Sequence, residues 1–349
     1  MKRIAGIVPA LVIASTIVMV GCKKDSGGDP VSYVDAYSVN LTEGEGTTYV
    51  GDFFPIRAGY TCNYSGDASM KTTVSIPGYE PSESTTNEPA TGMLKILALR
   101  TIPLPGGATP LYPVVDMTTT SSQTVFDTSR YFMKDTQAVY IKALKLPNGE
   151  FMEVENPVFM KSRLVVGDAW ETAPRLDMTK LLENQSPESG ITSNVTVNAR
   201  AKFFVVGKET ISLPIGTRNA MRVEQANDIS MNGTFSTSEI TANVTMTAQL
   251  AVVYHLIADT GIVSQNVTGP LDMNLSAEGQ TLTIRIEINR SELKLTSLST
   301  GLYATMLPGV GNHRTFAEAP VTFTTQTEEK LWRLSQTITR TLTKKLNLQ

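Results

Sequence analysis

The sequence predicts an all-β fold: a single large antiparallel sheet, either strongly curved as in a half-barrel or folded into a sandwich, with few short helices. Three observations support this class. Long stretches alternate apolar and polar residues with a period of two. The chain is rich in threonine, serine and valine, which favour strands. Segments with helical spacing are scarce.

The alternation is clearest in two segments. In "NVTVNARAKFFVV", residues 194–206, the odd positions are apolar and the even positions are mostly polar. In "ITANVTMTAQLAVVYHLI", residues 240–257, the even positions are apolar instead. Because strands are typically about five or six residues long, runs of this length indicate a tall, curved antiparallel sheet.

Turns and irregularities are predicted between the strands. In "TLTIRIEINRSELKLTSL", residues 281–298, the apolar parity changes, which indicates a bulge or turn near Asn289–Ser291. Asn232–Gly233 is the strongest two-residue hairpin signal. Further turns are expected at 277–280 and 147–150, and loops at 78–92 and 301–320.

The domain plan has four parts. Residues 1–21 form a signal peptide, 22–46 a lipidated N-terminus with a flexible tether, and 47–300 the antiparallel β domain. Residues 301–349 form a loop and a C-terminal element that packs on this domain. The pattern of 321–349 fits both a helix and a strand, and its threonines favour the strand.

The N-terminus has the layout of a secretory signal. Lys2 and Arg3 precede a mainly apolar stretch from Ile4 to Gly21, and Cys22 follows directly. Val20, Gly21 and Cys22 resemble the lipobox of bacterial lipoproteins, which implies that Cys22 carries fatty acyl chains, such as palmitate, and becomes the first mature residue. The alternative is an uncleaved membrane helix followed by an ordinary cysteine.

The predicted lipid anchor implies a cellular location. Lys23 follows Cys22, where enteric bacteria place an aspartate to retain lipoproteins in the inner membrane, so we expect the outer membrane, facing the periplasm or the cell surface. Removal of Lys2 and Arg3 with the signal changes the net charge from −3 to −5, which does not favour nucleic-acid binding. The other cysteine, Cys62, has no internal partner, and we expect it to be buried.

Several motifs resemble one family in the expected order. "FFPIRAGYTCNY" (53–64), "RLVVGDAWE" (163–171), "ISLPIGTRNAMRVE" (211–224) and "YHLIADTGIVSQNVTG" (254–269) resemble segments of uncharacterised bacterial exported domains called TapB-like. Cys62 stands where that family usually has tryptophan. The resemblance implies a single curved antiparallel domain, similar to the LolA/LolB lipoprotein carriers, and it brings no catalytic residues.

Chemistry-bearing residues are few, and we predict no catalytic, cofactor-binding or metal-binding residues. His255 and His313 lie far apart in the sequence without an acidic or cysteine cluster. Asp116, Asp127 and Asp135 would be a glycosidase pair only if two carboxylates lay about 5–9.5 Å apart in a cleft.

Three functions follow as hypotheses. The first is a non-enzymatic envelope lipoprotein that binds a lipid or another hydrophobic ligand on the concave face of its sheet. The second is a structural or adhesion component that docks to another envelope protein. The third, less favoured, is a hydrolase with an acidic pair. Methionines could line an adaptable apolar groove, although ordinary core packing is the commoner role.

Overall fold

The structure is a computed structural model. The structure describes residues 32–120, 124–145, 149–154, 158–172, 192–236, 241–277 and 280–299. These residues belong to one unit of the chain, 18–301. The expected signal peptide, Cys22 and the C-terminal segment 301–349 lie outside the described residues.

Strands dominate the described residues, with one short helix, α2 (Tyr33–Ala36), before them. The strands are β1 (Thr48–Val50), β2 (Thr61–Ser75), β3 (Ser82–Ile96), β4 (Arg100–Leu104), β5 (Gly107–Thr120), β6 (Thr124–Lys134), β7 (Ala138–Lys145), β8 (Phe151–Glu153), β9 (Val158–Lys161), β10 (Arg163–Val165), β11 (Ala169–Thr172), β12 (Thr192–Leu213), β13 (Gly216–Ser236), β14 (Thr241–Ile257), β15 (Gly261–Ala277) and β16 (Gln280–Ser299). The all-β prediction is confirmed.

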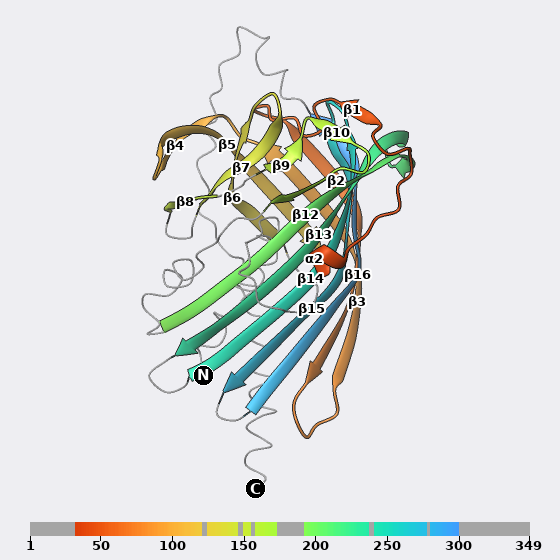
Figure 1. Cartoon of the computed structure of the whole chain (residues 1–349). Coiled ribbons are helices and arrows are strands. Elements are labelled where there is room, and N and C mark those ends of the chain that lie inside the picture. The colour runs from red at the N-terminus through yellow and green to blue at the C-terminus, as the bar shows by residue number, and fades with distance from the viewer. Residues whose placement is uncertain are drawn as a thin grey trace, which may run out of the picture. The chain divides into compact units, whose positions relative to one another are not determined.

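One antiparallel sheet of 14 strands forms the body, in the order β11-β12-β13-β14-β15-β16-β2-β3-β5-β6-β7-β8. β4 adds to β5, β9 adds to β7, and β1 and β10 form a separate pair. The first long strand, β2, therefore pairs with the last, β16. Figure 1 shows the long strands β12–β16 side by side and strongly curved.

The sheet curves but does not close into a barrel, since its end strands β11 and β8 are not paired to each other in the described part of the chain. The two sides of the sheet come close where β11 meets β9: the Thr172 hydroxyl on β11 donates to the Val158 carbonyl on β9 at 2.7 Å. The half-barrel prediction is thus confirmed over the sandwich.

Bulges help to bend the long strands. The register shifts between Val267 and Gly269 on β15 and between Ile288 and Arg290 on β16, which confirms the irregularity predicted near residue 289. Gly269 has φ +131°, and a Cβ there would lie 2.1 Å from the Gln249 carbonyl oxygen. Only glycine fits this close approach of two strands.

Two turn and loop predictions are wrong. Asn232–Gly233 lies inside β13, where Gly233 is opposite both Val195 on β12 and Val244 on β14. Pairing on both sides satisfies the backbone and outweighs the local turn preference. Residues 78–92 were expected to be a loop, but β3 begins at Ser82. This part of β3 looks like a loop in sequence because its side chains are mostly exposed and therefore polar.

Candidate functional site

The inner face of the sheet is filled by aromatic rings at one end. Phe203 on β12 stacks on Trp170 with ring centres 5.0 Å apart, and meets Phe159 edge-on at 6.2 Å. Phe159 in turn meets Phe54 at 5.1 Å and Phe132 at 5.7 Å. These rings come from opposite sides of the curved sheet, so this aromatic end is a packed core.

A buried hydrogen-bonded chain lies beside the rings. The Tyr254 hydroxyl donates to the Gln225 side-chain oxygen at 2.9 Å, and Gln225 donates to Asn227 at 2.8 Å. Asn227 then donates to the Leu250 carbonyl at 3.2 Å. Burial raises the pKa of Tyr254 above its usual value, so its hydroxyl stays a donor. Buried polar groups paired in this way fix the positions of β13 and β14.

Two of the three predicted acidic residues come together, but around a buried arginine. Arg130, 6% exposed, contacts Asp116 at 2.6 Å and Asp127 at 3.1 Å. Burial alone would lower the pKa of Arg130, but the two carboxylates raise it. Asp135 lies apart in a turn and accepts from the backbone of Gln137 and Ala138. The arrangement is a buried ion cluster in which the arginine holds both carboxylates.

His255 on β14 lies in a row of charged and polar side chains on the outer face. Its side chain is 13% exposed on the outer face, and its Nε2 contacts Glu209. Glu209 also contacts Arg222 at 3.2 Å, and Arg222 contacts Glu224 at 2.7 Å. Tyr37 completes this row by donating to Glu224 at 2.6 Å. His313 lies outside the described residues.

The other half of the long strands carries a continuous apolar surface on its inner face. We call it the inner apolar band: Ile229 and Met231 on β13, Val244, Met246 and Ala248 on β14, Leu271, Met273 and Leu275 on β15, and Leu282, Ile284 and Ile286 on β16. The register places these residues in three rows, two across all four strands and one across β14, β15 and β16.

The middle row of the band is rich in methionine. Met231, Met246 and Met273 are direct cross-strand neighbours, and Ile284 continues the row. The sequence analysis considered methionines as lining of an apolar groove, but the pairing of Met231, Met246 and Met273 depends on strand register, which the sequence alone does not specify. Unbranched, polarizable methionine side chains adapt to apolar groups of irregular shape.

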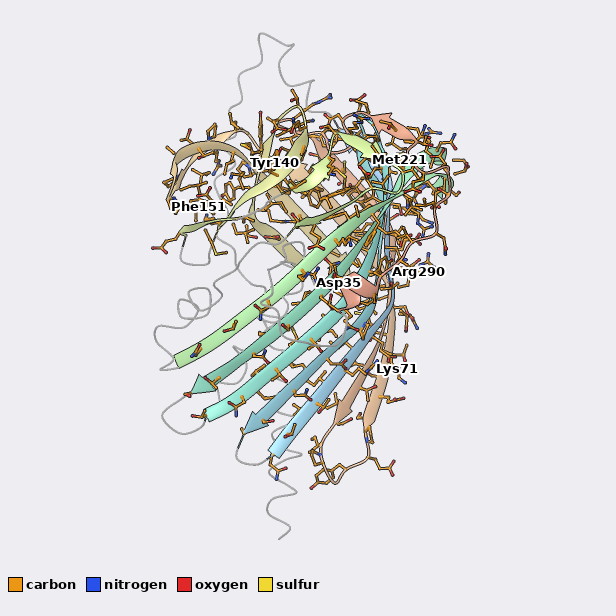
Figure 2. All side chains as sticks on the ribbon, in the orientation of Figure 1. Asp35, Lys71, Tyr140, Phe151, Met221 and Arg290 are labelled. Atoms are coloured by element: carbon orange, nitrogen blue, oxygen red, sulfur yellow. The ribbon has the colours of Figure 1, made fainter. Side chains whose placement is uncertain are left out.

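The opposite face of the same strands is polar. Thr245 and Thr247 are exposed between the buried residues of β14. On β15 and β16, Arg285 contacts Asp272 at 3.6 Å and Glu287 at 3.0 Å. Figure 2 shows Lys71, which contacts Glu83 at 2.9 Å, pointing away from the sheet. Each strand therefore separates an apolar inner face from a solvated outer face.

Burial differs along the inner apolar band. Its members on β13 and β14 are 1–6% exposed, whereas those on β15 and β16 are half-buried. At the aromatic end, Cys62 is 1% exposed, which confirms the expected burial. The half-buried part of the band is thus the apolar surface of the inner face with room for contact.

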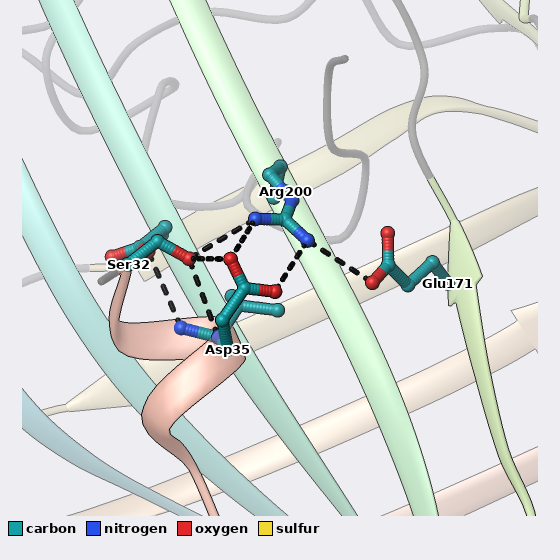
Figure 3. Close-up of polar contacts among 6 residues, drawn as sticks. Ser32, Asp35, Glu171 and Arg200 are labelled. Atoms are coloured by element: carbon teal, nitrogen blue, oxygen red, sulfur yellow. Dashed lines mark hydrogen bonds and ion pairs between the residues drawn. The ribbon is translucent and has the colours of Figure 1, made fainter. Parts of the chain in front are cut away.

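The short helix α2 lies on the outer face of the sheet. Figure 1 shows α2 in front of the long strands, and α2 contacts β12 and β13. Val34 is fully buried there. Arg200 on β12 bonds Asp35 at 2.7 and 2.9 Å, Ser32 at 3.0 Å and Glu171 at 3.0 Å (Figure 3). These contacts hold α2 on the sheet, and the tether over 22–46 stays a prediction.

Metal and membrane-spanning features were sought in the described residues. No group of histidine, cysteine, aspartate and glutamate there could hold a metal ion. In the same residues no helix has the length and apolar character to cross a bilayer.

Comparison with known proteins gives weak likenesses. No family model and no curated protein matches the chain, so the TapB-like resemblance stays a prediction. A solved protein assigned as exported, with a YmcC-like fold, from Bacteroides fragilis shares 11% identity, with a TM-score of 0.23, over 71% of this chain and 99% of that one. A protein assigned as a lipoprotein from Parabacteroides distasonis shares 11% identity, with a TM-score of 0.22, over 72% and 100%. TM-scores this low support no conclusion about the fold or function of this chain.

Proposed function

We propose that this protein is an exported lipoprotein of the cell envelope that binds the acyl chain of a lipid or another amphiphile on the inner apolar band, without catalysis. The observation that carries the proposal is the in-register apolar surface across β13–β16, opposite a polar outer face. Half-buried leucine, isoleucine and methionine side chains would gain about 25 cal/mol per Å² of apolar surface covered.

The two ends of the inner face support a division of roles. At the aromatic end, the rings around Phe203 pack against one another and stabilise the fold. Along the band, Leu271, Ile284 and Ile286 are half-buried and so can contact a ligand. With strands about 4.8 Å apart and a rise of about 3.3 Å per residue, the band measures roughly 14 by 13 Å.

A matched pair of variants tests ligand binding. Ile284→Lys places a charge in the band, whereas Thr283→Lys places the same charge one residue away, on the outer face. The probe is a fluorescent undecanoic acid displaced by fatty acids of increasing length. We expect wild type and Thr283→Lys to bind, with affinity rising roughly fourfold per methylene from about 0.8 kcal/mol, and Ile284→Lys to lose binding.

The result that would overturn ligand binding is equally definite. If wild-type protein does not bind the probe, or if Ile284→Lys binds it as Thr283→Lys does, the band is only part of the folded core. Native mass spectrometry of the gently purified chain supplies a second measurement, because a bound amphiphile adds a defined mass.

The anchor is proposed at Cys22, on the outer membrane. We infer that Cys22 is the mature first residue and carries the acyl chains that hold the protein on the bilayer, since two or more chains anchor firmly. Mass spectrometry of the mature N-terminus should find an acylated Cys22, and Cys22→Ala should release the protein from the outer-membrane fraction. An unmodified Cys22 in the mature chain contradicts the anchor.

The second candidate function, docking to another envelope protein, has one specific feature in its favour. The strand edge formed by residues 192–200 of β12 has no partner strand in the described part of the chain. Crosslinking in intact membranes should then capture a distinct envelope protein. A protein that binds no amphiphile but is crosslinked to such a partner would favour docking over amphiphile binding.

A further inference from the structure

The sheet has two uncovered strand edges where its long strands extend past the aromatic end. On β12, the strand β11 covers only Ala201–Phe204. On β3, the strand β5 covers only Ala90–Ile96. Within the described ranges, residues 192–200 of β12 and 82–89 of β3 therefore pair on one side only.

The backbone of β12 presents regular hydrogen-bonding groups at its edge. The Val205 N–H donates to the Asp168 carbonyl at 2.9 Å, and the Val205 carbonyl accepts from the Gly167 N–H at 3.0 Å. Both backbone groups of Val205 therefore point toward the β11 side. Because these groups alternate along an antiparallel strand, Ala199, Val197 and Val195 turn theirs to the same side. Nine residues at about 3.3 Å each give an edge roughly 30 Å long.

The two edges differ in how they are protected. The β3 edge, "SESTTNEP", carries Pro89 and the exposed Glu83, which contacts Lys71, while Glu88 is buried. Proline and exposed charge are the usual means of preventing edge-to-edge pairing. The β12 edge, "TSNVTVNAR", has neither proline nor an acidic residue. Its one charge, Arg200, is already bound to Asp35 and Glu171. The β12 edge is therefore neutral and unprotected.

We propose that the β12 edge pairs with the β12 edge of a second copy of this chain, antiparallel, with a two-fold axis at Thr196. In this register Val195 lies opposite the partner's Val197, so the outward-turned N–H and carbonyl groups meet in hydrogen-bonded pairs. Arg200 lies opposite the partner's Thr192, so the pairing stops just before Ala201, the first residue of β12 that β11 covers.

The outward side chains also suit self-pairing. Asn194, Thr196 and Asn198 are exposed, and this register sets Asn194 opposite the partner's Asn198 and Thr196 opposite the partner's Thr196. Amide and hydroxyl pairs of this kind stabilise adjacent strands. We infer that the partner is a second copy of this chain because the β12 edge is uncharged and complementary to itself. A two-fold dimer also forms a closed assembly that does not grow further. The pairing would join two sheets, with an inner apolar band on each.

Cysteine crosslinking tests the register directly, on detergent-solubilised full-length protein. Thr196 is a non-hydrogen-bonded position, where facing Cα atoms lie about 4.5–5.5 Å apart, within disulfide range. We expect Thr196→Cys to form a covalent dimer rapidly under mild oxidation. Thr85→Cys, equally exposed on the β3 edge, and wild type should not. Equal crosslinking of Thr196→Cys and Thr85→Cys would overturn the proposal.

A second pair of variants measures association without a crosslink. Thr196→Asp places two like charges on the axis and should halve the mass measured by light scattering, whereas Thr85→Asp should leave a dimer. Hydrogen exchange at Val195 and Val197 should become faster on dilution. A monomeric wild type, or protection that does not change with dilution because the chain covers its own edge, would contradict the dimer.

Discussion

Arg200 and Asp35 form a two-point ion pair between segments 165 residues apart in the sequence: both guanidinium nitrogens donate to the carboxylate, at 2.7 and 2.9 Å. The pair holds α2 on the outer face of β12, together with Val34, which is fully buried. Ser32 is the tenth residue after Cys22, so a chain anchored at Cys22 keeps Ser32 within about 36 Å of its lipid. In the proposed anchored form, the ion pair would therefore set the distance between the lipid and the sheet.

Arg200→Ala is therefore expected to release the N-terminal segment while the sheet remains folded. A partly exposed ion pair contributes up to about 1 kcal/mol, so hydrogen exchange over residues 33–36 should rise roughly fivefold. Arg285→Ala is the matched control, because Arg285 also makes ion pairs on the outer face, with Asp272 on β15 and Glu287 on β16. Equal effects of the two variants would show that the Arg200 pair does not hold α2.

The same contact predicts a pH dependence. The hydrogen bond from Arg200 lowers the pKa of Asp35 to about 2, from an ordinary value near 3.8. A lowered folded-state pKa stabilises docking fully above the unfolded value, and this contribution is lost as the pH falls from about 4 through about 2. Exchange over α2, corrected for intrinsic rates, should rise in that window. Asp35→Asn should remove the dependence and weaken docking at neutral pH.

Cys62 is expected to be unreactive in the folded protein. Its side chain is 1% exposed, and burial raises the pKa of its thiol, so little of the reactive thiolate forms. A thiol reagent at pH 8 should label Cys62 only after denaturation, in a chain that lacks Cys22. Thr85→Cys, on an exposed position, should react at once under the same conditions. Fast labelling of native Cys62 would contradict its buried position.

Much of the sheet could be predicted from the sequence because residue alternation reports burial directly. In β14 the buried residues Val244, Met246 and Leu250 follow the predicted parity. Alternation does not predict the start of β3, because residues 82–87 are exposed on both faces and no apolar residue alternates with a polar one there. The turn prediction at Asn232–Gly233 is wrong for another reason: strand pairing on both sides of β13 overrides the local turn preference.

The candidate site was less accessible to prediction than the fold. The methionine row needs the register of three strands, and the register of β14 with β15 includes a shift between His255 and Leu256 that no local pattern specifies. The cluster of Asp116, Asp127 and Arg130 needs the pairing of β5 with β6. Docking of α2 depends on a contact between Asp35 and Arg200, and no local pattern at Asp35 indicates this distant partner.

Phe203 and Phe204 provide a direct test of which face of β12 supports the fold. Phe203 is fully buried among Trp170, Phe159 and Tyr254, whereas Phe204, on the other face, packs on Tyr37 with ring centres 5.6 Å apart. Truncation of a buried phenylalanine leaves a cavity, so Phe203→Ala should lower the free energy of unfolding by about 3–5 kcal/mol.

Phe204→Ala should cost roughly 1 kcal/mol or less, because its ring is only half-buried and the truncated site stays open to water. The measurement is urea unfolding of both variants beside the wild type. In addition, Phe204→Ala should raise hydrogen exchange near Tyr37, which Phe203→Ala should leave unchanged as long as the sheet is folded. Similar losses of stability in the two variants would mean that the aromatic end is not the core of this sheet.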